Sequence, residues 1–379
     1  MERRTFLAHA SSSLSWLAGF QSPSEKDYVS LFDGVSRSGW TVQDGPDSDY
    51  RFRNGWIETA PGASPHSWLR SIEQYENFDF QCDFFIEGWM EGGIYLHAPE
   101  HGRNTWVGMM IKIFRAPELG KNSIGAVFPV VRPLKAVVRN RGEWNQIRVL
   151  MDWPRLKVWM NDEVVQDLDV ESIPALRHRF RRGYLGLTGL ATPLRFRNMR
   201  IRILPDKLSW TRMFETDGDL ENWTIMPERP NAAVEWTAHD GVLRGVGSGN
   251  LVSRACYRDF ELMAYVRAAP NCNSGVFFRT AGKGLAGDYY EVQIFNVPDA
   301  HYITGSLYGF DRGEYPHVQD EQWFPIQLWV KDRRCVVRVN GDTVVDYGLL
   351  ENLQEGHVEL QAHRADRWVE FKTIRIRCI

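Results

Sequence analysis

The chain has 379 residues, of which 43% are hydrophobic and 25% are charged, and its formal net charge is −3 at pH 7. This composition excludes a disordered or fibrous chain and provides enough apolar material for two globular cores. Because the charge forms no basic stripe, the electrostatic term that drives nucleic-acid binding is missing, and no nucleic-acid partner is expected.

The first residues predict export. Arg3-Arg4 precedes a short apolar and serine-rich stretch from Leu14 to Phe20, which resembles a twin-arginine export signal. The stretch is too short and too often interrupted by serine to form a transmembrane anchor. An ordinary basic terminus is the alternative, because no A-x-A cleavage site is visible. We assign residues 1–27 to a signal and linker and expect a periplasmic or extracellular location in a bacterium.

Several enzyme classes lack support in the sequence. There is no G-x-S-x-G motif, no Cys/His nucleophile signature and no glycine-rich loop for phosphate. The five cysteines include no C-x-x-C pair and no metal-ligand spacing.

The sequence contains a long internal repeat. The segment from Phe32 to Leu204 aligns with the segment from Phe214 to the C-terminus, and matching landmarks follow in the same order. They include Asn77–Phe80 with Asp259–Leu262, Gly93–Leu96 with Gly275–Phe278, and Trp144, Asn161 and Phe196 with Trp323, Asn340 and Phe371. A repeat of this length indicates two complete domains, which we place at 28–204 and 208–379. The short linker predicts that they pack against each other.

Both copies are dominated by short runs in which apolar and polar residues alternate. From Phe78 to Phe84, for example, Asp79, Gln81 and Asp83 face away from the phenylalanines, which is typical of a half-buried strand. Hairpin dipeptides separate the runs, at Asn54-Gly55, Asp240-Gly241 and Asn340-Gly341. A weak helical pattern occurs only around 171–182. The sequence therefore predicts an all-β protein of two tandem jelly-roll β-sandwiches.

The order of motifs resembles one known family. The strings that carry the likeness include Asp259–Leu262, Asn273–Arg279, Tyr290–Phe295 and Leu360–His363. They resemble the 3-keto-disaccharide hydrolase domain family, a concanavalin-like, laminarinase-G-like jelly roll, in two copies of which the first is degenerate. The resemblance implies a carbohydrate substrate and implies that these strands of the second copy are neighbours.

Strand alternation predicts which side chains of the second copy share a face. The three strands contribute Asn273, Gly275, Phe277 and Arg279; Glu291 and Gln293; and Glu359, Gln361 and His363. If the strands are neighbours, these polar side chains converge on one face of a sheet. Such a face is not a dry core, because each unpaired polar group would cost several kcal/mol. It is either an open cleft or a fully paired network, and we favour the cleft.

The substrate that the resemblance implies has a ketone at C3 of a sugar. The ketone acidifies the C2 hydrogen, so cleavage needs a base near C2 and a positive group or a Lewis acid near O3. His363 or Glu291 is the candidate base. Arg279, or a divalent metal ion held by Glu291 and His363, is the candidate for stabilising the oxyanion. The alternative for Arg279 and Glu291 is a structural ion pair between two strands.

Four further residues of the second copy are candidates for substrate binding. Asn273, Gln293 and Gln361 are amides suited to sugar hydroxyls, and Tyr308 follows a glycine turn that lines the same region.

The first copy has different residues at the aligned positions, namely Glu91, His97, Met110, Lys112, Thr188 and Leu190. We expect a degenerate copy that is kept for packing or weak sugar binding. The alternative is that Glu91, His97 and Lys112 form a site of their own.

Three functions remain in competition. The leading one is an exported hydrolase or lyase that cleaves 3-keto glycosides with its second domain, and the sequence does not choose between the two reactions. The others are a non-catalytic carbohydrate-binding protein and an interaction scaffold. In an enzyme, Glu291, His363 and Arg279 are expected to lie close enough to share one sugar ring.

Overall fold

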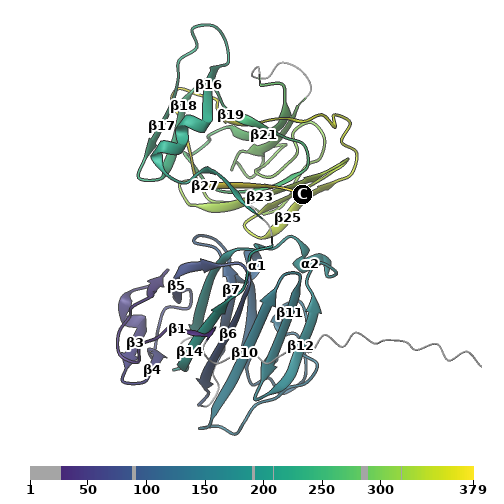
Figure 1. Ribbon diagram of the computed structural model, residues 1–379. Coiled ribbons are helices and arrows are strands. Elements are labelled where there is room, and N and C mark those ends of the chain that lie inside the picture. Colours follow the sequence, from purple (N-terminus) through teal and green to yellow (C-terminus); the bar gives the residue numbers. More distant parts are fainter. Residues whose placement is uncertain (1–26, 88–90, 190–192, 208, 283–288, 317) are drawn as a thin grey trace, which may run out of the picture.

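A computed structural model describes residues 27–87, 91–189, 193–207, 209–282, 289–316 and 318–379 of the chain (Figure 1). The chain forms two stacked β-sandwiches, one for each copy of the repeat, and each sandwich consists of two antiparallel sheets. The prediction of an all-β fold of two tandem jelly rolls is confirmed.

The first sandwich has an eight-stranded and a six-stranded sheet. The eight-stranded sheet runs in the order β12 (Glu163–Asp169), β11 (Arg155–Met160), β10 (Trp144–Asp152), β6 (Phe78–Phe85), β14 (Arg195–Ile203), β4 (Trp56–Thr59) and β3 (Tyr50–Arg53), with β1 (Val29–Ser30) beside β14. The six-stranded sheet runs in the order β2 (Trp40–Gln43), β5 (Trp68–Tyr75), β13 (Gly183–Gly189), β7 (Glu91–Ala98), β8 (Met109–Phe114) and β9 (Val127–Phe128).

The second sandwich has an eight-stranded and a five-stranded sheet. The larger sheet contains β17 (Val234–His239), β18 (Val242–Gly247), β27 (Trp368–Cys378), β20 (Phe260–Ala268), β23 (Phe324–Lys331), β24 (Arg334–Val339) and β25 (Asp342–Tyr347), with β15 (Thr211–Phe214) beside β27. The five-stranded sheet runs in the order β16 (Trp223–Pro227), β19 (Gly249–Tyr257), β26 (Gly356–Ala362), β21 (Ser274–Thr280) and β22 (Tyr290–Ile294).

Helices are few and short in the described residues. They are α1 (Asn104–Val107), α2 (Pro174–Arg177) and the 3-10 turns Asp47–Asp49 and Asp217–Asn222. The weak helical pattern at 171–182 thus corresponds to the single turn α2. None of the helices in the described ranges is long and apolar enough to cross a membrane.

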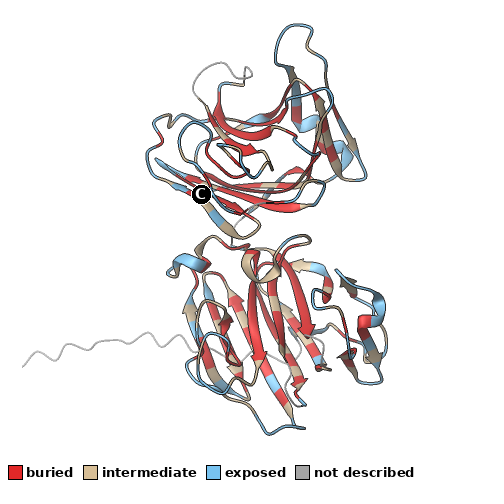
Figure 2. Cartoon of the chain, turned by 180° about the vertical axis from the view of Figure 1, so that it is seen from behind, coloured by how far each residue is buried: buried red, intermediate tan, exposed pale blue. Residues whose placement is uncertain are grey.

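Each sandwich has its own apolar core between its two sheets, and Figure 2 shows in red all buried residues, among which these cores lie. Strand alternation produces these cores. On β6 the side chains of Phe78, Phe80, Cys82 and Phe84 are at most 1% exposed, whereas the polar residues between Phe80 and Phe84 face outward. The hairpin dipeptide Asn340-Gly341 has positive φ at both residues, 48° and 92°, as a two-residue turn between β24 and β25 requires.

The two sandwiches pack through unlike surfaces. The end of the first sandwich that carries α1 and α2 contacts the outer face of the larger sheet of the second (Figure 1). Met263 and Tyr265 of β20 are buried there together with Val107 and Phe180. The Glu100 backbone N–H donates to the Tyr265 hydroxyl at 2.7 Å. As a result β20 is buried on both faces, unlike its counterpart β6.

Candidate functional site

The outer face of the five-stranded sheet in the second domain carries the main cluster of candidate side chains. We call it the polar face, and it consists of Asn250, Gly275, Phe277, Glu291, Gln293, His357, Glu359 and Gln361. Their strand neighbours Leu251, Val276, Val292 and Leu360 point the other way, into the core. The sheet register places Gly275 opposite Gln293 and Phe277 opposite both Glu291 and Glu359. Three of the predicted site residues, Glu291, Gln293 and Gln361, therefore lie on one face.

Glu291 is the acidic group on this face that is placed to titrate near neutral pH. Its carboxylate lies over Gly275, where an added Cβ would come within 2.5 Å of Oε1. Burial raises the pKa of Glu291 to about 7. Within the described residues, no hydrogen bond or ion pair to its carboxylate is found. A buried acid with these properties can accept a proton at neutral pH and release it again.

The predicted amides lie beside it. The Gln293 amide donates to Asn273 Oδ1 and, at 3.4 Å, to the Ser274 carbonyl. Gln361 is 7% exposed, and its Oε1 accepts no hydrogen bond from the described residues. An amide oxygen that is buried without a partner is available to a ligand hydroxyl.

Glu359 is part of the site, although the sequence did not single it out as a functional residue. It is fully buried, and Asn250 Nδ2 donates to its Oε2 at 2.7 Å while Thr280 Oγ1 donates to its Oε1 at 2.5 Å. Strand alternation predicted that Glu359 lies on the polar face, and this was the signal in the sequence that could have identified it as a site residue. Its two partners come from other strands and could not be identified without the strand pairing. Some side chains of the polar face thus form hydrogen bonds with one another, whereas the Glu291 carboxylate has no partner among the described residues.

Arg279 does not lie on the polar face. A β-bulge between Phe277 and Thr280 gives Arg279 a positive φ of 55° and reverses the direction of its side chain. The guanidinium is fully buried among the backbone carbonyls of Arg258, Asp332 and Asn352 and the Asp259 carboxylate, at 2.9 to 3.2 Å. Strand alternation does not continue across the bulge, so the prediction that Arg279 lies on the polar face was wrong. Its ion-pair partner is Asp259 and not Glu291.

His363 is also separate from the cluster. Strand β26 ends at Ala362, so His363 follows the sheet and is exposed. The structure consequently does not assemble Glu291, His363 and Arg279 around one point. In the part of the chain that the structure describes, no group of three or more His, Cys, Asp or Glu side chains is placed to hold a metal ion.

Two tyrosines border the polar face. The Tyr308 backbone N–H donates to the Glu291 carbonyl at 2.9 Å, and its side chain is 51% exposed. Burial raises the pKa of Tyr289, and the nearby charges of Glu291 and Tyr308 raise it further. The Tyr289 ring packs 5.4 Å from that of Phe277. Tyr289 was not singled out from the sequence, although alternation from Glu291 places it on the same face.

One end of the corresponding face of the first domain is occupied by its own side chains. Lys112, 3% exposed, forms an ion pair with Glu91 and lies 4.5 Å from the centre of the Phe128 ring. His97 occupies the same kind of bulge as Arg279, with φ of 53°, and its Nε2 lies 2.7 Å from the Glu76 carbonyl. Burial lowers the pKa of His97 to about 4. Glu91, His97 and Lys112 thus do not converge on a common site, and Leu190 lies outside the described residues.

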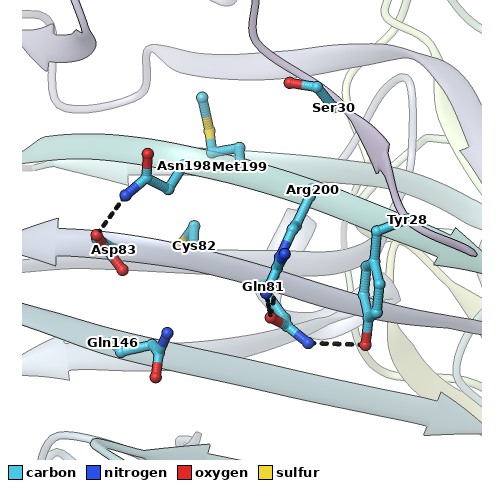
Figure 3. A pocket seen from close by; sticks show the side chains of 9 residues that line it. All are labelled: Tyr28, Ser30, Gln81, Cys82, Asp83, Gln146, Asn198, Met199 and Arg200. Carbon is cyan, nitrogen blue, oxygen red and sulfur yellow. Dashed lines mark hydrogen bonds between the residues drawn. The ribbon is translucent and has the colours of Figure 1, made fainter. Parts of the chain in front are cut away.

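A pocket of about 450 Å³ lies on the outer face of the larger sheet of the first domain (Figure 3). Its polar side chains bond to one another. Gln81 donates to the Tyr28 hydroxyl at 2.7 Å, Arg200 donates to Gln81 at 2.8 Å, and Asn198 donates to Asp83 at 2.7 Å. The carboxylate of Asp83, the acidic side chain of this pocket, thus has hydrogen-bond partners in Arg197 and Asn198.

Solved structures resemble one half of the chain. A proposed glycosyl hydrolase from Parabacteroides distasonis is 19% identical, with a TM-score of 0.43, and the match covers 48% of this chain and 99% of that one. The carbohydrate-binding module CBM66 from Bacillus subtilis is 13% identical, with a TM-score of 0.32, over 41% and 95%. A lichenase from a mouse hindgut metagenome is 11% identical, with a TM-score of 0.32, over 45% and 98%. At these identities the similarity concerns the fold alone.

A search of curated proteins gave no match. The model of the 3-keto-alpha-glucoside-1,2-lyase-like domain, in contrast, matches twice, at residues 27–202 and 209–377, which together span most of the chain. The chain therefore belongs to the 3-keto-alpha-glucoside-1,2-lyase-like domain family and contains the domain twice.

Proposed function

We propose that the second domain cleaves 3-keto glycosides and that Glu291 is the catalytic base. The observation that carries the proposal is the unpaired, buried carboxyl of Glu291, whose pKa of about 7 suits proton transfer at neutral pH. The family match supports a carbohydrate-active role. Glu291 stands on a face otherwise lined by amides, which suits a ligand rich in hydroxyl groups.

The chemistry follows from the ketone. The Glu291 carboxylate takes the proton from C2, and the electron pair of the C2–H bond forms an enolate with its charge on O3. The C1–O bond then breaks as the C1–C2 double bond forms and the C3 ketone is restored. The aglycone oxygen takes a proton from water, and the hydroxide that remains is neutralised by the proton that Glu291 took from C2. The product is an unsaturated 3-keto sugar, and addition of water to its double bond would give the hydrolysis product. The same first step thus serves a lyase or a hydrolase.

The neighbouring side chains have positioning roles in this scheme. The Gln361 amide would hold sugar oxygens through its N–H groups, including the developing charge on O3, and would accept from a hydroxyl through its unpaired Oε1, while Gln293 orients Asn273. Buried Glu359 fixes Asn250 and Thr280 by hydrogen bonds at 2.7 and 2.5 Å. Such a satisfied network keeps the floor of the site rigid while Glu291 changes its charge. Arg279 has no role in the scheme, because its side chain is directed away.

The test is the release of p-nitrophenol from p-nitrophenyl 3-keto-α-glucoside, with and without a chelator. Removal of a general base typically costs about 10² to 10⁴ in rate, so Glu291→Gln should lose activity by that factor. The rate of His363→Ala is measured for comparison, because His363 is the other candidate base. Loss in His363→Ala with full activity in Glu291→Gln would reassign the base. No release by the wild type would favour the alternative, a non-catalytic carbohydrate-binding protein. A chelator-sensitive rate would add a metal ion to the site.

We further propose that the protein is exported, on the basis of the Arg3-Arg4 pair and the apolar stretch that follows it. This segment lies outside the described residues. Fractionation of bacterial cells that produce the full chain should find the protein outside the cytoplasm, and Arg3→Lys with Arg4→Lys should retain it inside. Cytoplasmic location of both forms would contradict export.

A further inference from the structure

We propose that the cavity between the two domains is a second binding site, specific for neutral oligosaccharides and separate from the polar face. The cavity has a volume of about 570 Å³, within the range of small-molecule sites. The first domain contributes Asp44, Tyr95 and Asn104 to its lining, and the second contributes Gln322 and Trp323. Neither domain alone forms the cavity, so it is a property of the tandem arrangement.

The walls of the cavity are held in place by direct contacts between the domains. The Arg103 backbone N–H donates to Asn340 Oδ1 at 2.9 Å. Gly102 has φ of 107°, and a Cβ there would lie 2.5 Å from the same Asn340 oxygen. A Cβ on Gly341 would likewise lie 2.6 Å from the Trp106 backbone. Glycines at these two close contacts allow the domains to approach each other, and the site is thereby preorganised.

The groups that line the cavity suit hydroxyl groups and apolar sugar faces. The Trp68 indole N–H donates to Asp44 Oδ2 at 3.1 Å, which orients a carboxylate with further lone pairs available to a ligand. The Tyr95 ring packs edge-on against Trp68, with centroids 5.6 Å apart. The Trp323 ring stacks on His101, with centroids 6.1 Å apart. Arg267 and Lys372 also lie 4.8 and 5.0 Å from the centre of the Trp323 ring, so Trp323 forms a fixed wall. The Tyr95 ring beside a fixed carboxylate and the two amides combines the two types of contact that a sugar ring needs.

The charges in the cavity disfavour an anionic ligand. Arg103 is paired with the Asp342 carboxylate, and Lys372, behind His101, is paired with Glu100 at 3.1 Å. The carboxylates of Asp44 and Glu321 also belong to the lining. A phosphorylated or sulfated sugar would meet carboxylates and no unpaired lysine or arginine within the described lining, and this disfavours its binding. A neutral oligosaccharide meets no such penalty.

This site would give the first copy a function although one end of its own outer face is closed. At that end Glu91 and Lys112 form an ion pair. Tyr95, which aligns with Phe277 of the polar face, lies on the same face and lines the cavity completed by the second domain. The cavity shares no residue with the polar face, so capture of a glycan here and cleavage there are separable.

The test is isothermal titration calorimetry of the full chain carrying Glu291→Gln, with cellotetraose, maltotetraose and laminaritetraose as probes. We expect at least one probe to bind, and the added pair Asn104→Ala and Gln322→Ala to weaken it by about tenfold or more, equivalent to ~1.4 kcal/mol. Gln322→Trp, which fills the cavity, should have the same effect. Gln354→Ala, an exposed amide elsewhere on the second domain, is the matched control. Thermal unfolding of every variant serves as the folding control.

The outcomes separate this proposal from the proposed catalysis. With Glu291 intact, the cavity variants should release p-nitrophenol from the 3-keto glucoside within about twofold of the wild-type rate. The cavity site is refuted if none of the three probes binds, or if binding persists unchanged in both the Asn104/Gln322 variant and Gln322→Trp. Loss of binding in Gln354→Ala would also refute it. None of these results would affect the assignment of Glu291.

Discussion

The carboxylate of Glu291 lies across Gly275 of the neighbouring strand, where a Cβ would come within 2.5 Å of Oε1 and 2.8 Å of Cγ. Neither contact leaves room for a side chain, because real Cβ atoms do not approach heavy atoms so closely. Gly275 thus provides the space in which the acidic side chain sits, and the position of the base depends on a residue without any functional group.

Gly275→Ala should therefore displace Glu291 while leaving the sheet intact. Misplacement of a catalytic group by about 1 Å can cost roughly 100-fold in rate, and we expect a loss of this order in p-nitrophenol release. Gly348→Ala is the matched control, since a Cβ there would meet nothing within 4 Å. Full activity of Gly275→Ala would show that the carboxylate position is unimportant.

The activity should depend on pH through Glu291. Below its pKa of about 7 the carboxyl is protonated and cannot accept the C2 proton. The value of kcat/KM should then rise about tenfold per pH unit below pH 7 and level off above it. Measurement from pH 5 to 9 would test this, and a midpoint near 4.5, the ordinary pKa of a glutamate, would contradict it.

Stability should show the opposite dependence on pH. The pKa of Glu291 is raised by burial from 4.5 to about 7, so the folded state binds a proton between these values that the unfolded state has released. The free energy of unfolding should consequently fall as pH rises through this window. Glu291→Gln has no titrating group at this position. Its free energy of unfolding relative to that of wild type should therefore be up to ~3 kcal/mol higher at pH 8 than at pH 5. Urea unfolding at both pH values measures this difference. If the substitution changes the free energy of unfolding equally at pH 5 and pH 8, the Glu291 carboxylate is not buried as described.

Arg279 should be essential for stability and dispensable for chemistry. Its guanidinium satisfies three backbone carbonyls and the Asp259 carboxylate, and its side chain is fully buried. Arg279→Ala would leave these acceptors unpaired and should cost about 3 kcal/mol or more. Exposed Arg333→Ala is the comparison. Activity per folded molecule should stay within about twofold of wild type, since the Arg279 side chain is directed away from the polar face. A stable but inactive Arg279→Ala variant would show that Arg279 contributes to catalysis.

The contact between the domains should be sensitive to a single methyl group. In Gly102→Ala the new Cβ would lie 2.5 Å from Asn340 Oδ1 and 2.8 Å from Pro325 Cδ, in addition to an unfavourable φ of 107°. We expect a cost of roughly 1–3 kcal/mol and separation of the calorimetric unfolding transitions of the two domains. Gly120→Ala, where a Cβ meets nothing within 4 Å, should leave the transitions unchanged. Identical profiles for both variants would mean that the domains are not coupled at this point.

The fold and most of the polar face were accessible from the sequence because strand alternation is a local property. Two-residue periodicity predicted the sandwiches, and it correctly placed Glu291, Gln293 and Gln361 on one face. It failed for two residues at strand ends. Arg279 follows a bulge, and His363 lies beyond the last residue of β26, so neither position continues the alternation of its strand.

By itself, the sequence determined that the chain has two related jelly-roll domains and that their polar residues differ. The tertiary structure decided which polar groups are paired. It brings Asn250 and Thr280 onto Glu359 from distant parts of the chain, leaves Glu291 unpaired among the described residues, and forms a cavity between domains. Periodicity is fixed by neighbouring residues, whereas pairing, burial and therefore the pKa of Glu291 depend on which strands and domains meet in space.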